Sequence, residues 1–418
     1  MRRMTPDQAE AYLLDLELFG MRFGLDRMHK LMTVLGMPQR RFASIHVVGS
    51  NGKSSTVRMI AAILERHGIR TGSYTSPHLR SFAERIEVGE RPVDPGDFAA
   101  AVARVAHAAA LVDRTAADDD RVTQFEALTA AAYHELARRG VEVAVVEAGL
   151  GGRYDATNVI PSKVQVLTSV GLEHTRWLGP TIADIAAEKL DVVRQYGTLV
   201  LPDGLDPDAL EVAERVAAER RAQIVWAPRE AETPLRALGR FQRANFSLAR
   251  TAAEAFKGPL DDAAVARAAA EVEVPGRMQV VEEQPLVIYD GAHNPAGAAA
   301  LAEALPELIP GPPTRRLVPV IGVLDDKDAA GMLRALLPLA DAVVFTRSRN
   351  PRSLPPATLV TLAAQLGGPA AEAVADPRAA VERARELAGP DGAVVATGSI
   401  YLIADLVREP SAVRVSRL

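Results

Sequence analysis

Short apolar runs alternate with longer amphipathic stretches along most of the chain. The runs are rich in valine, isoleucine and leucine and lie at residues 44–48, 141–147, 163–170, 197–201, 285–290, 316–323, 340–346 and 392–397. Alanine-rich stretches with a helical spacing of apolar residues lie between them, for example at 55–67, 181–195, 295–308 and 378–388. Apolar runs of this kind are typical of parallel strands covered on both faces, and their alternation with helices indicates an α/β fold.

One stretch interrupts the alternation. Residues 273–285, with the sequence EVPGRMQVVEEQP, combine proline, glycine and several acidic residues. We therefore expect two domains, at residues 1–275 and 285–418, which agrees with the two or three domains that 418 residues suggest. The first should contain a doubly wound, mainly parallel sheet, and the second should be a smaller Rossmann-like α/β domain.

The composition excludes several classes of protein. The net charge of −5 and the pI near 6.0 argue against a nucleic-acid-binding protein, which normally presents a basic face. The chain has no cysteine, so disulfides, zinc–thiolate sites and cysteine nucleophiles are excluded. Asp15 and Glu17 interrupt the first apolar stretch, and no apolar run approaches the ~20 residues of a membrane-spanning helix. We expect a cytoplasmic protein that acts on small molecules as a monomer, away from membranes.

The sequence HVVGSNGKSST, at residues 46–56, resembles a phosphate-binding loop with a shortened front end. It lies between an apolar run and a helical stretch, but the full pattern G-x-x-x-x-G-K-[ST] would require glycine where the chain has Val47. Backbone N–H groups of residues 50–54 at a helix N-terminus would bind phosphate oxygens, and Lys53 would neutralise their charge. A turn followed by a helix cap is the alternative interpretation.

Polar residues follow the carboxyl ends of neighbouring predicted strands. Glu147 ends one run and His174 lies just beyond another, so a parallel sheet would bring both to the edge that carries the loop. Together with a hydroxyl of Ser54 or Ser55, they would suit a magnesium ion shared with phosphate. Taken alone, His174 could equally be an ordinary loop histidine.

Two further segments in the first domain contain candidate binding residues. The sequence EAGLGGRYDATN, at residues 147–158, has three glycines that would allow the backbone to approach a ligand closely. The segment 123–140 begins with Thr123 and Glu126, which predict a capping box, and reaches Gly140 at its end. For Glu126, the capping role and a ligand-binding role remain equally open.

The second predicted domain repeats this arrangement. Asp290 ends a strand, the sequence GAHNP leads into a helix with Pro295 near its start, and TGSIYL follows the strand at 392–397. Two sheets with polar groups at their strand ends suggest a cleft for two substrates.

In this order the motifs resemble the folylpolyglutamate synthase/dihydrofolate synthase family, relatives of the Mur ligases. The resemblance covers nearly the whole chain and includes GSNGKSS (49–55), YTSPHL (74–79), ERI (84–86), EAGLGGRYDATN (147–158), TSVGLEHTRWLG (168–179), GRFQRAN (239–245), PGRMQ (275–279), YDGAHNP (289–295) and TGSIYL (397–402). It implies an ATP-dependent amide ligase of folate biosynthesis, with Mg²⁺ and ATP, that joins L-glutamate to dihydropteroate or a folate.

The resemblance also implies a role for each matching residue. The residues implied to bind ATP are Asn51, Gly52, Lys53, Ser54, Asn245, Arg277 and Asp290. Those implied to bind magnesium are Ser55, Ser76, Glu147 and His174. His293 and Ser399 would contact glutamate, and the pterin side would meet Gly24, Leu25, Asp26, Thr123, Gln124, Phe125, Glu126, Tyr154, Asp155 and Ala156. Lys189 matches the family lysine that is carbamylated to carry a carboxylate to magnesium, and Lys53, Lys189 and His174 would form the catalytic set.

Alternatives remain for Lys189, for the loop and for the reaction. From its position alone, Lys189 would be a surface lysine near the end of a helix, where its charge favours the helix dipole. Ser54 departs from the family pattern by adding a side chain where the loop usually has glycine. A Mur-type ligase is the nearest rival, but only about 40 residues precede the loop, too few for the domain such enzymes use to bind UDP. A guanine-nucleotide switch would require an N-K-x-D element, and the chain contains no Asn-Lys pair.

Overall fold

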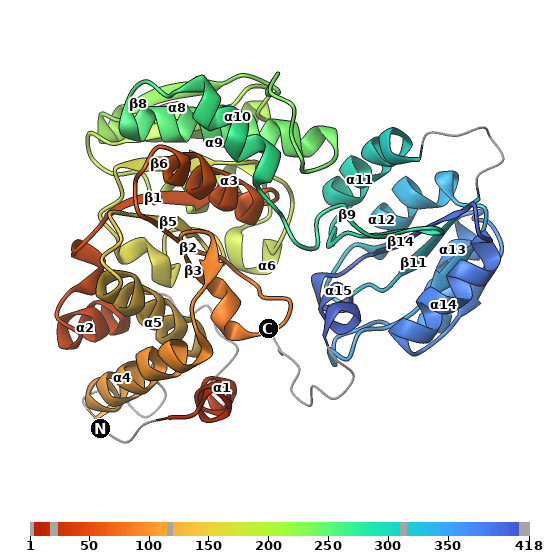
Figure 1. Cartoon of the computed structure of the whole chain (residues 1–418), viewed down its shortest axis with the longest axis horizontal. Coiled ribbons are helices and arrows are strands. Elements are labelled where there is room, and N and C mark those ends of the chain that lie inside the picture. Colours follow the sequence, from red (N-terminus) through yellow and green to blue (C-terminus); the bar gives the residue numbers. More distant parts are fainter. Residues whose placement is uncertain (1–3, 17–23, 115–119, 310–315, 409–418) are drawn as a thin grey trace. The chain divides into compact units, whose positions relative to one another are not determined.

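The computed structural model of the chain describes residues 4–16, 24–114, 120–309 and 316–408 (Figure 1). The chain forms two compact units. The first comprises residues 1–236 and 243–272, and the second comprises residues 237–242 and 273–418. Within the described ranges, no helix is both long and apolar enough to cross a membrane.

The first unit contains an eight-stranded sheet. Its strands are β1 (Ala43–Val48), β2 (Thr71–Tyr74), β3 (Ile86–Val88), β4 (Arg91–Pro92), β5 (Val143–Glu147), β6 (Val164–Leu167), β7 (Thr198–Pro202) and β8 (Gln223–Ala227). Its α-helices are α1 (Pro6–Asp15), α2 (Asp26–Val34), α3 (Lys53–Arg66), α4 (Pro95–Asp113), α5 (Gln124–Arg138), α6 (Thr175–Leu178), α7 (Ile182–Leu190), α8 (Pro207–Arg220) and α10 (Asp262–Glu271). Helix α9 (Arg240–Lys257) begins in the second unit and continues in the first, and short 3-10 helices cover Pro38–Arg40, Phe82–Arg85 and Ala156–Val159.

The strand order is β4-β3-β2-β5-β1-β6-β7-β8. The strands β2, β5, β1, β6, β7 and β8 run parallel to one another. At one edge of the sheet, β3 pairs with β2 in the antiparallel direction, and β4 pairs with β3 in the same way. This confirms the doubly wound, mainly parallel sheet. The register pairs Val47 of β1 with Glu147 of β5, and Val48 with Leu167 of β6. The three strands therefore end at one level, and the loops that follow them lie at the same sheet edge.

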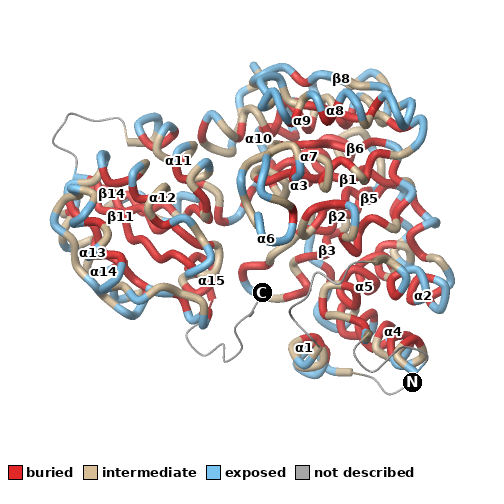
Figure 2. The backbone as a smooth tube through the Cα atoms, turned by 180° about the vertical axis from the view of Figure 1, so that it is seen from behind, coloured by how far each residue is buried: buried red, intermediate tan, exposed pale blue. Residues whose placement is uncertain are grey.

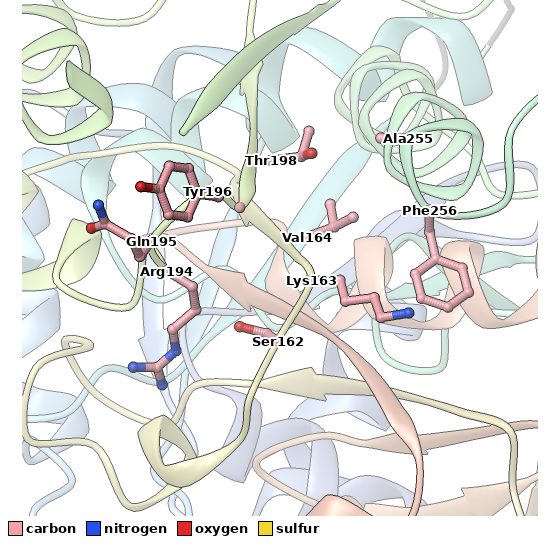
Figure 3. Close-up of a pocket in the computed structure, with 10 residues that line it drawn as sticks. Ser162, Lys163, Val164, Arg194, Gln195, Tyr196, Thr198, Ala255 and Phe256 are labelled. Atoms are coloured by element: carbon pink, nitrogen blue, oxygen red, sulfur yellow. The ribbon is translucent and has the colours of Figure 1, made fainter. Parts of the chain in front are cut away.

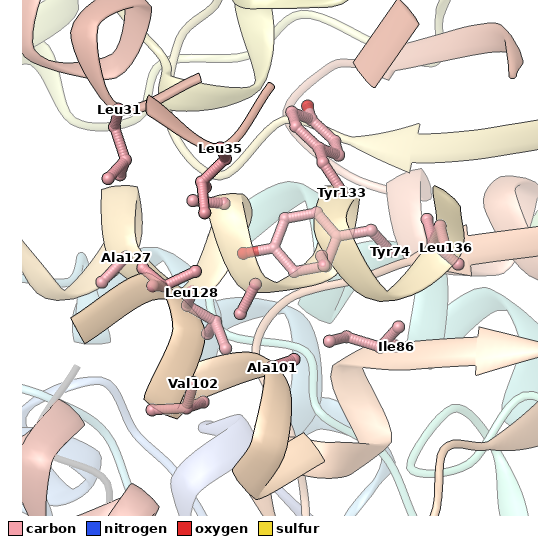
Figure 4. Close-up of a cluster of buried hydrophobic side chains, with 14 of the residues drawn as sticks. Leu31, Leu35, Tyr74, Ile86, Ala101, Val102, Ala127, Leu128, Tyr133 and Leu136 are labelled. Atoms are coloured by element: carbon pink, nitrogen blue, oxygen red, sulfur yellow. The ribbon is translucent and has the colours of Figure 1, made fainter. Parts of the chain in front are cut away.

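The core of the first unit explains why the central strands are mostly apolar. Every residue of β5 is buried, as is every residue of β1 after Ala43 (Figure 2). Helices α4 and α5 pack together, and Leu128 and Tyr133 of α5 lie in one buried cluster with Tyr74 and Ile86 (Figure 4). The Tyr133 hydroxyl donates to the Thr157 carbonyl at 3.0 Å, so the buried polar group remains satisfied.

The second unit contains a six-stranded sheet of order β13-β12-β11-β14-β10-β9. Its strands are β9 (Gln279–Glu283), β10 (Leu286–Tyr289), β11 (Leu317–Ile321), β12 (Val343–Phe345), β13 (Ala371–Ala373) and β14 (Ala393–Thr397). Its helices are α11 (Pro295–Leu308), α12 (Ala329–Leu336), α13 (Pro356–Gln365), α14 (Pro377–Ala388) and α15 (Ile400–Val407), with a 3-10 turn at Leu337–Leu339. Only β9 is antiparallel to its neighbour, and it forms part of the stretch that interrupts the sequence pattern.

Two predicted elements end three or more residues earlier than the apolar pattern indicates, for a tertiary reason in each case. The strand expected at 163–170 ends at Leu167, because the next residues turn to bond the loop after β1. The helix expected at 181–195 ends at Leu190. Beyond it, Arg194 donates to the carbonyls of Asn158 and Ile160, which fixes the chain in a turn rather than a helix.

Candidate active site

The shortened phosphate loop lies between β1 and α3. Gly52 precedes the first residue of α3 with a φ of 85°, a left-handed conformation that favours glycine, and no side chain caps the helix. The first-turn N–H groups of a helix have no partner within the helix, so this end suits an anion. The Lys53 ammonium folds back and donates to the carbonyls of Gly49 at 2.8 Å and Ser50 at 3.3 Å.

Two of the expected phosphate donors are already bonded. The Ser50 N–H donates to the Ser169 carbonyl at 2.9 Å, and the Asn51 N–H donates to the Ser169 hydroxyl at 2.9 Å. The expectation that all N–H groups from 50 to 54 face phosphate is therefore wrong for these two, because the segment after β6 binds them.

Glu147 and Ser54 meet at the start of α3. The Ser54 hydroxyl donates to Glu147 Oε1 at 3.0 Å, and the Ser76 N–H donates to Oε2 at 3.0 Å. Ser76 thus contacts Glu147 through its backbone. Ser55, the serine that the family resemblance assigns to magnesium, is buried in α3. The additional hydroxyl of Ser54 occupies the position beside the carboxylate.

Lys189 is buried, so the interpretation as a surface lysine is wrong. Its side chain is 2% exposed, and its ammonium lies 2.9 Å from Glu173 Oε1 and 3.0 Å from the Gly49 carbonyl oxygen. Burial lowers the pKa of Lys189, and the carboxylate of Glu173 opposes this shift. Burial by itself would raise the pKa of Glu173, but the charges of Lys189 and Lys53 outweigh it and lower that pKa to about 2.

His174 directly follows Glu173 and precedes α6, with a left-handed φ of 48°. The loop from β6 therefore carries His174 at the edge of the sheet that carries the phosphate loop. Among the residues that the structure describes, no cluster of three or more histidine or acidic side chains forms a complete metal site.

The start of α5 confirms the predicted capping box. The Thr123 hydroxyl accepts from the Glu126 N–H at 3.3 Å, and the Glu126 carboxylate accepts from the Thr123 N–H at 2.8 Å. Glu126 also pairs with the buried Arg27 of α2, at 3.1 Å. Gln124 donates to the Leu13 carbonyl at 2.7 Å. These contacts account for Glu126 and for the amide nitrogen of Gln124 without a ligand.

The glycines after β5 are required by protein packing. A Cβ on Gly149 would lie 2.5 Å from the Phe125 ring, and one on Gly152 would lie 2.5 Å from the Lys189 carbonyl oxygen. The expectation that these glycines leave space for a ligand is therefore wrong at both positions. The close contacts seat the loop against the start of α5 and the end of α7.

Asp155 organises the same loop. Its carboxylate accepts from the N–H groups of Leu150 at 2.8 Å and Thr157 at 3.0 Å. Burial raises the pKa of Asp155, and these hydrogen bonds oppose the shift. Tyr154 is partly exposed and Ala156 is buried. Asp155 therefore has a structural role that its position in the motif did not reveal.

The remaining pterin-side candidates lie at the start of α2. Gly24 has a φ of 112°, Leu25 precedes the helix, and Asp26 is its first residue. A Cβ added to Gly24 would meet nothing within 4 Å, so the surroundings of this glycine are open.

One residue that is predicted to contact ATP, Asn245, lies against the phosphate loop. A Cβ on Gly52 would lie 2.4 Å from the Asn245 side-chain oxygen, so this buried asparagine of α9 packs directly against the loop. The structure thereby brings Asn245 to the predicted nucleotide site of the first unit, almost two hundred residues along the chain from Gly52.

The second unit places its candidates at the carboxyl ends of β10 and β14. Asp290 is buried and accepts from the N–H groups of Met278 at 2.9 Å and Ala292 at 2.7 Å. Burial raises the pKa of Asp290, and Arg277 opposes the shift. His293 Nδ1 lies 3.0 Å from the Gly291 carbonyl oxygen.

Two candidate residues of the second unit lie at helix starts. Pro295 is the first residue of α11, as predicted. Ser399 caps α15 by accepting from the Tyr401 N–H at 3.2 Å. The side chain of Ser399 therefore has a structural partner in addition to any role toward glutamate.

A cavity of about 370 Å³ lies elsewhere in the first unit, at the amino ends of β6 and β7 (Figure 3). Lys163, Tyr196 and Phe256 line it, with the Lys163 ammonium 5.8 Å from the centre of the Phe256 ring. Because the phosphate loop follows the carboxyl end of β1, this cavity belongs to the opposite edge of the sheet. None of the predicted site residues lines this cavity.

Sequence reasoning missed four residues that hold the site together. Thr168 and Ser169 bond the phosphate loop, Glu173 pairs with Lys189, and Arg27 pairs with Glu126. Thr168, Ser169 and Glu173 lie in the motif that contains His174, which was the available signal. For Arg27, no signal was available other than its position next to Asp26.

Comparisons with known proteins identify the relatives of the chain. Residues 276–400 match the family described as Mur ligase, glutamate ligase domain. The dihydrofolate synthase/folylpolyglutamate synthase of Mycobacterium tuberculosis is 36% identical over 417 residues, a match that covers 87% of this chain and 84% of that protein.

Two solved structures are similar over nearly their whole length. The Mycobacterium tuberculosis folylpolyglutamate synthase complexed with ADP has a TM-score of 0.89 and 34% identity, covering 96% of this chain and 97% of that one. Escherichia coli FolC in complex with DHPP and ADP has a TM-score of 0.85 and 28% identity, with the same coverage. The identity and its extent show that the chain belongs to the folylpolyglutamate synthase/dihydrofolate synthase family of the Mur ligase superfamily.

Proposed function

We propose that the protein is an ATP-dependent ligase that joins L-glutamate to the carboxylate of a folate-type substrate, which is dihydropteroate, a reduced folate or both. The observation that carries the proposal is the phosphate loop at the carboxyl edge of the first sheet, with Lys53 at the start of α3 and Glu147 bonded to Ser54. Its relatives support it, since one solved structure contains ADP and another contains ADP with DHPP.

The reaction proceeds in two steps. The substrate carboxylate attacks the γ-phosphorus of ATP, which forms an acyl phosphate and releases ADP. The amine of L-glutamate then attacks the acyl carbonyl and loses a proton, and inorganic phosphate leaves from the tetrahedral intermediate as the amide forms. The protein contributes positioning and charge neutralisation, and it needs no covalent nucleophile.

The nucleotide phosphates would bind at the start of α3. The N–H groups of Gly52, Lys53 and Ser54 are the donors there, and the Lys53 ammonium would exchange its carbonyl partners for phosphate oxygens. Asn51 and Asn245 are the further contacts proposed in the first unit. Arg277 and Asp290, in the second unit, remain predicted ATP contacts.

The residues beside the loop fit a nucleotide-borne magnesium ion. Mg²⁺ usually binds one or two carboxylates, several waters and substrate phosphates, and Glu147 supplies a carboxylate next to a serine hydroxyl. Glu147 and His174, with Ser54, Ser55 or Ser76, would hold the ion. When bound, magnesium would neutralise the phosphate charge during transfer.

The substrate-binding assignments divide into two groups. Gly24, Leu25, Asp26, Phe125 and Tyr154 are proposed to contact the pterin-side substrate directly. Thr123, Gln124, Glu126, Asp155 and Ala156 would act by shaping the surrounding loops, because each has at least one polar group with a protein partner or, for Ala156, because the residue is buried. His293 and Ser399 remain the proposed glutamate contacts.

We further propose that Lys189 works as a carbamate, which the family resemblance implies. Carbamylation would turn the buried ammonium beside Glu173 into an anion, so Glu173 would lose its partner and magnesium would gain an oxygen ligand. Lys189→Ala should abolish activity, and added short-chain carboxylates should restore part of it by filling the vacated space. Full activity of the variant, or an active enzyme whose native mass lacks the added carbon dioxide, would exclude the carbamate.

A substitution at the loop tests the ligase function. Lys53→Ala should lower turnover by at least about a hundredfold, in line with the loss of one preorganised electrostatic group. Lys163→Ala, at the opposite edge of the sheet, is the matched control and should leave turnover unchanged. The same assay, run with dihydropteroate and with tetrahydrofolate, identifies the substrate. ADP release without any folate-type acid or glutamate would contradict the ligase assignment.

A further inference from the structure

The segment that follows β6 holds the peptide groups of Asn51 in the phosphate loop. The Asn51 N–H donates to the Ser169 hydroxyl at 2.9 Å. The Asn51 carbonyl oxygen accepts from the Thr168 hydroxyl at 2.5 Å and lies 3.2 Å from the Ser169 hydroxyl. Hydrogen bonds therefore fix the peptide groups on both sides of Asn51, and all of them come from residues more than a hundred positions further along the chain.

Neighbouring contacts extend the same attachment. The Ser50 N–H donates to the Ser169 carbonyl at 2.9 Å, and the Gly171 N–H donates to the Ser50 hydroxyl at 3.0 Å. A Cβ on Gly49 would lie 2.0 Å from the Thr168 hydroxyl oxygen. Glycine is thus required at position 49 because the threonine hydroxyl occupies the space beside it.

These contacts explain how a loop that lacks the usual first glycine keeps its shape. Glu147 and the helix start fix the loop at one end through Ser54. The segment after β6 fixes it at the other end and uses the N–H groups of Ser50 and Asn51 to do so. The donors left for phosphate therefore begin at Gly52.

We propose that Thr168 and Ser169 are positioning residues for the nucleotide: their hydroxyls hold the shortened loop in its binding conformation before ATP arrives. They touch no reacting atom and act through Asn51. A loop ordered in advance loses less conformational entropy on binding, so the two hydroxyls should contribute to nucleotide affinity. The inference rests on the proposed function, because it takes the loop to be the ATP site.

Titration calorimetry with ADP tests the inference in the full chain. Ser169→Ala and Thr168→Val should each weaken ADP binding about five- to tenfold, as expected for the loss of one or two hydrogen bonds. Thr168→Ser keeps the hydroxyl and should bind ADP like the unaltered protein. Ser162→Ala is the matched control, because it removes a buried hydroxyl that bonds Gln165 at the other end of β6.

The kinetic readout separates positioning from general destabilisation. In both hydroxyl-deletion variants the KM for ATP should rise while the KM for glutamate stays unchanged. Ser162→Ala also loses a buried hydroxyl, but its KM for ATP should stay unchanged, because that hydroxyl lies at the other end of β6. Amide hydrogen exchange over residues 49–53 should become faster without nucleotide and return to normal with ADP. Because this exchange is compared with and without ADP in the same variant, it remains informative for a variant that is less stable.

The possible outcomes are distinct. Unchanged ADP affinity and unchanged loop exchange in both variants would overturn the inference, as would an equal loss of affinity in Ser162→Ala. If the unaltered protein binds no ADP, or if Lys53→Ala binds it equally well, the proposed function fails and the inference fails with it.

Discussion

Glu126 offers a direct choice between a structural role and a substrate-binding role. Its carboxylate accepts from the Thr123 N–H at 2.8 Å and pairs with Arg27 at 3.1 Å, with both charged side chains 8% exposed. Removing one partner of a buried ion pair typically costs about 3–5 kcal/mol, because the other charge is left buried. Arg27 would retain Asp120, which is 46% exposed, so the lower end of that range applies. The Thr123 hydroxyl still caps the helix, because it accepts from the backbone of residue 126. Loss of the hydrogen bond from the Thr123 N–H to the carboxylate adds about 1 kcal/mol.

We therefore expect Glu126→Ala to lower the free energy of unfolding of the first unit by about 4 kcal/mol. Glu126→Gln keeps an acceptor for the Thr123 N–H and should cost less, about 2–3 kcal/mol. Replacing both partners, in the double variant Arg27→Met with Glu126→Met, should cost less stability than Glu126→Ala. The single variant leaves the charge of Arg27 buried without Glu126, whereas an apolar pair leaves no buried charge.

Urea unfolding followed by tryptophan fluorescence measures these changes. The chain has two tryptophans, Trp177 and Trp226, and both lie in the first unit, so their signal reports on that unit. Unchanged stability in Glu126→Ala together with a large rise in the KM for the folate-type substrate would refute the structural role. A double variant as unstable as the sum of the two single variants would refute the coupling to Arg27.

Three further predictions concern other parts of the first unit. Burial lowers the pKa of His46 to about 3, so its neutral form contributes stability above the unfolded value near 6.5 that is lost as pH falls. This loss should be about 1 kcal/mol at pH 5.5 and be absent in His46→Leu; parallel pH profiles of the two proteins would contradict it. Gly152→Ala should cost about 1–3 kcal/mol by overpacking against the Lys189 carbonyl, whereas Gly171→Ala, which meets nothing within 4 Å, should be near neutral in thermal unfolding. Ser54→Gly should raise the KM for ATP about two- to fivefold in steady-state kinetics, and an unchanged KM would show that its bond to Glu147 is dispensable.

The sequence by itself determined the features that depend on neighbours along the chain. Apolar runs marked β1, β5, β10 and β14 because a strand that is buried on both faces is apolar at most of its positions. The cap at Thr123 and the proline at the start of α11 were predictable for the same reason, since a cap bonds a residue three positions away and Pro295 has the backbone angle of a first helical turn.

Tertiary structure decided what the polar residues contact. Lys189 could be a surface lysine by sequence, yet packing buries it against Glu173 and the Gly49 carbonyl, 140 residues away. Gly149 and Gly152 could equally have faced a ligand, but the Phe125 ring and the Lys189 carbonyl take that space. Ser169 reaches the loop only because β1 and β6 are adjacent in the sheet. Hydrophobic periodicity fixes which face of an element is buried, whereas the partner of a buried polar atom is set by strand order and register, which local sequence does not encode.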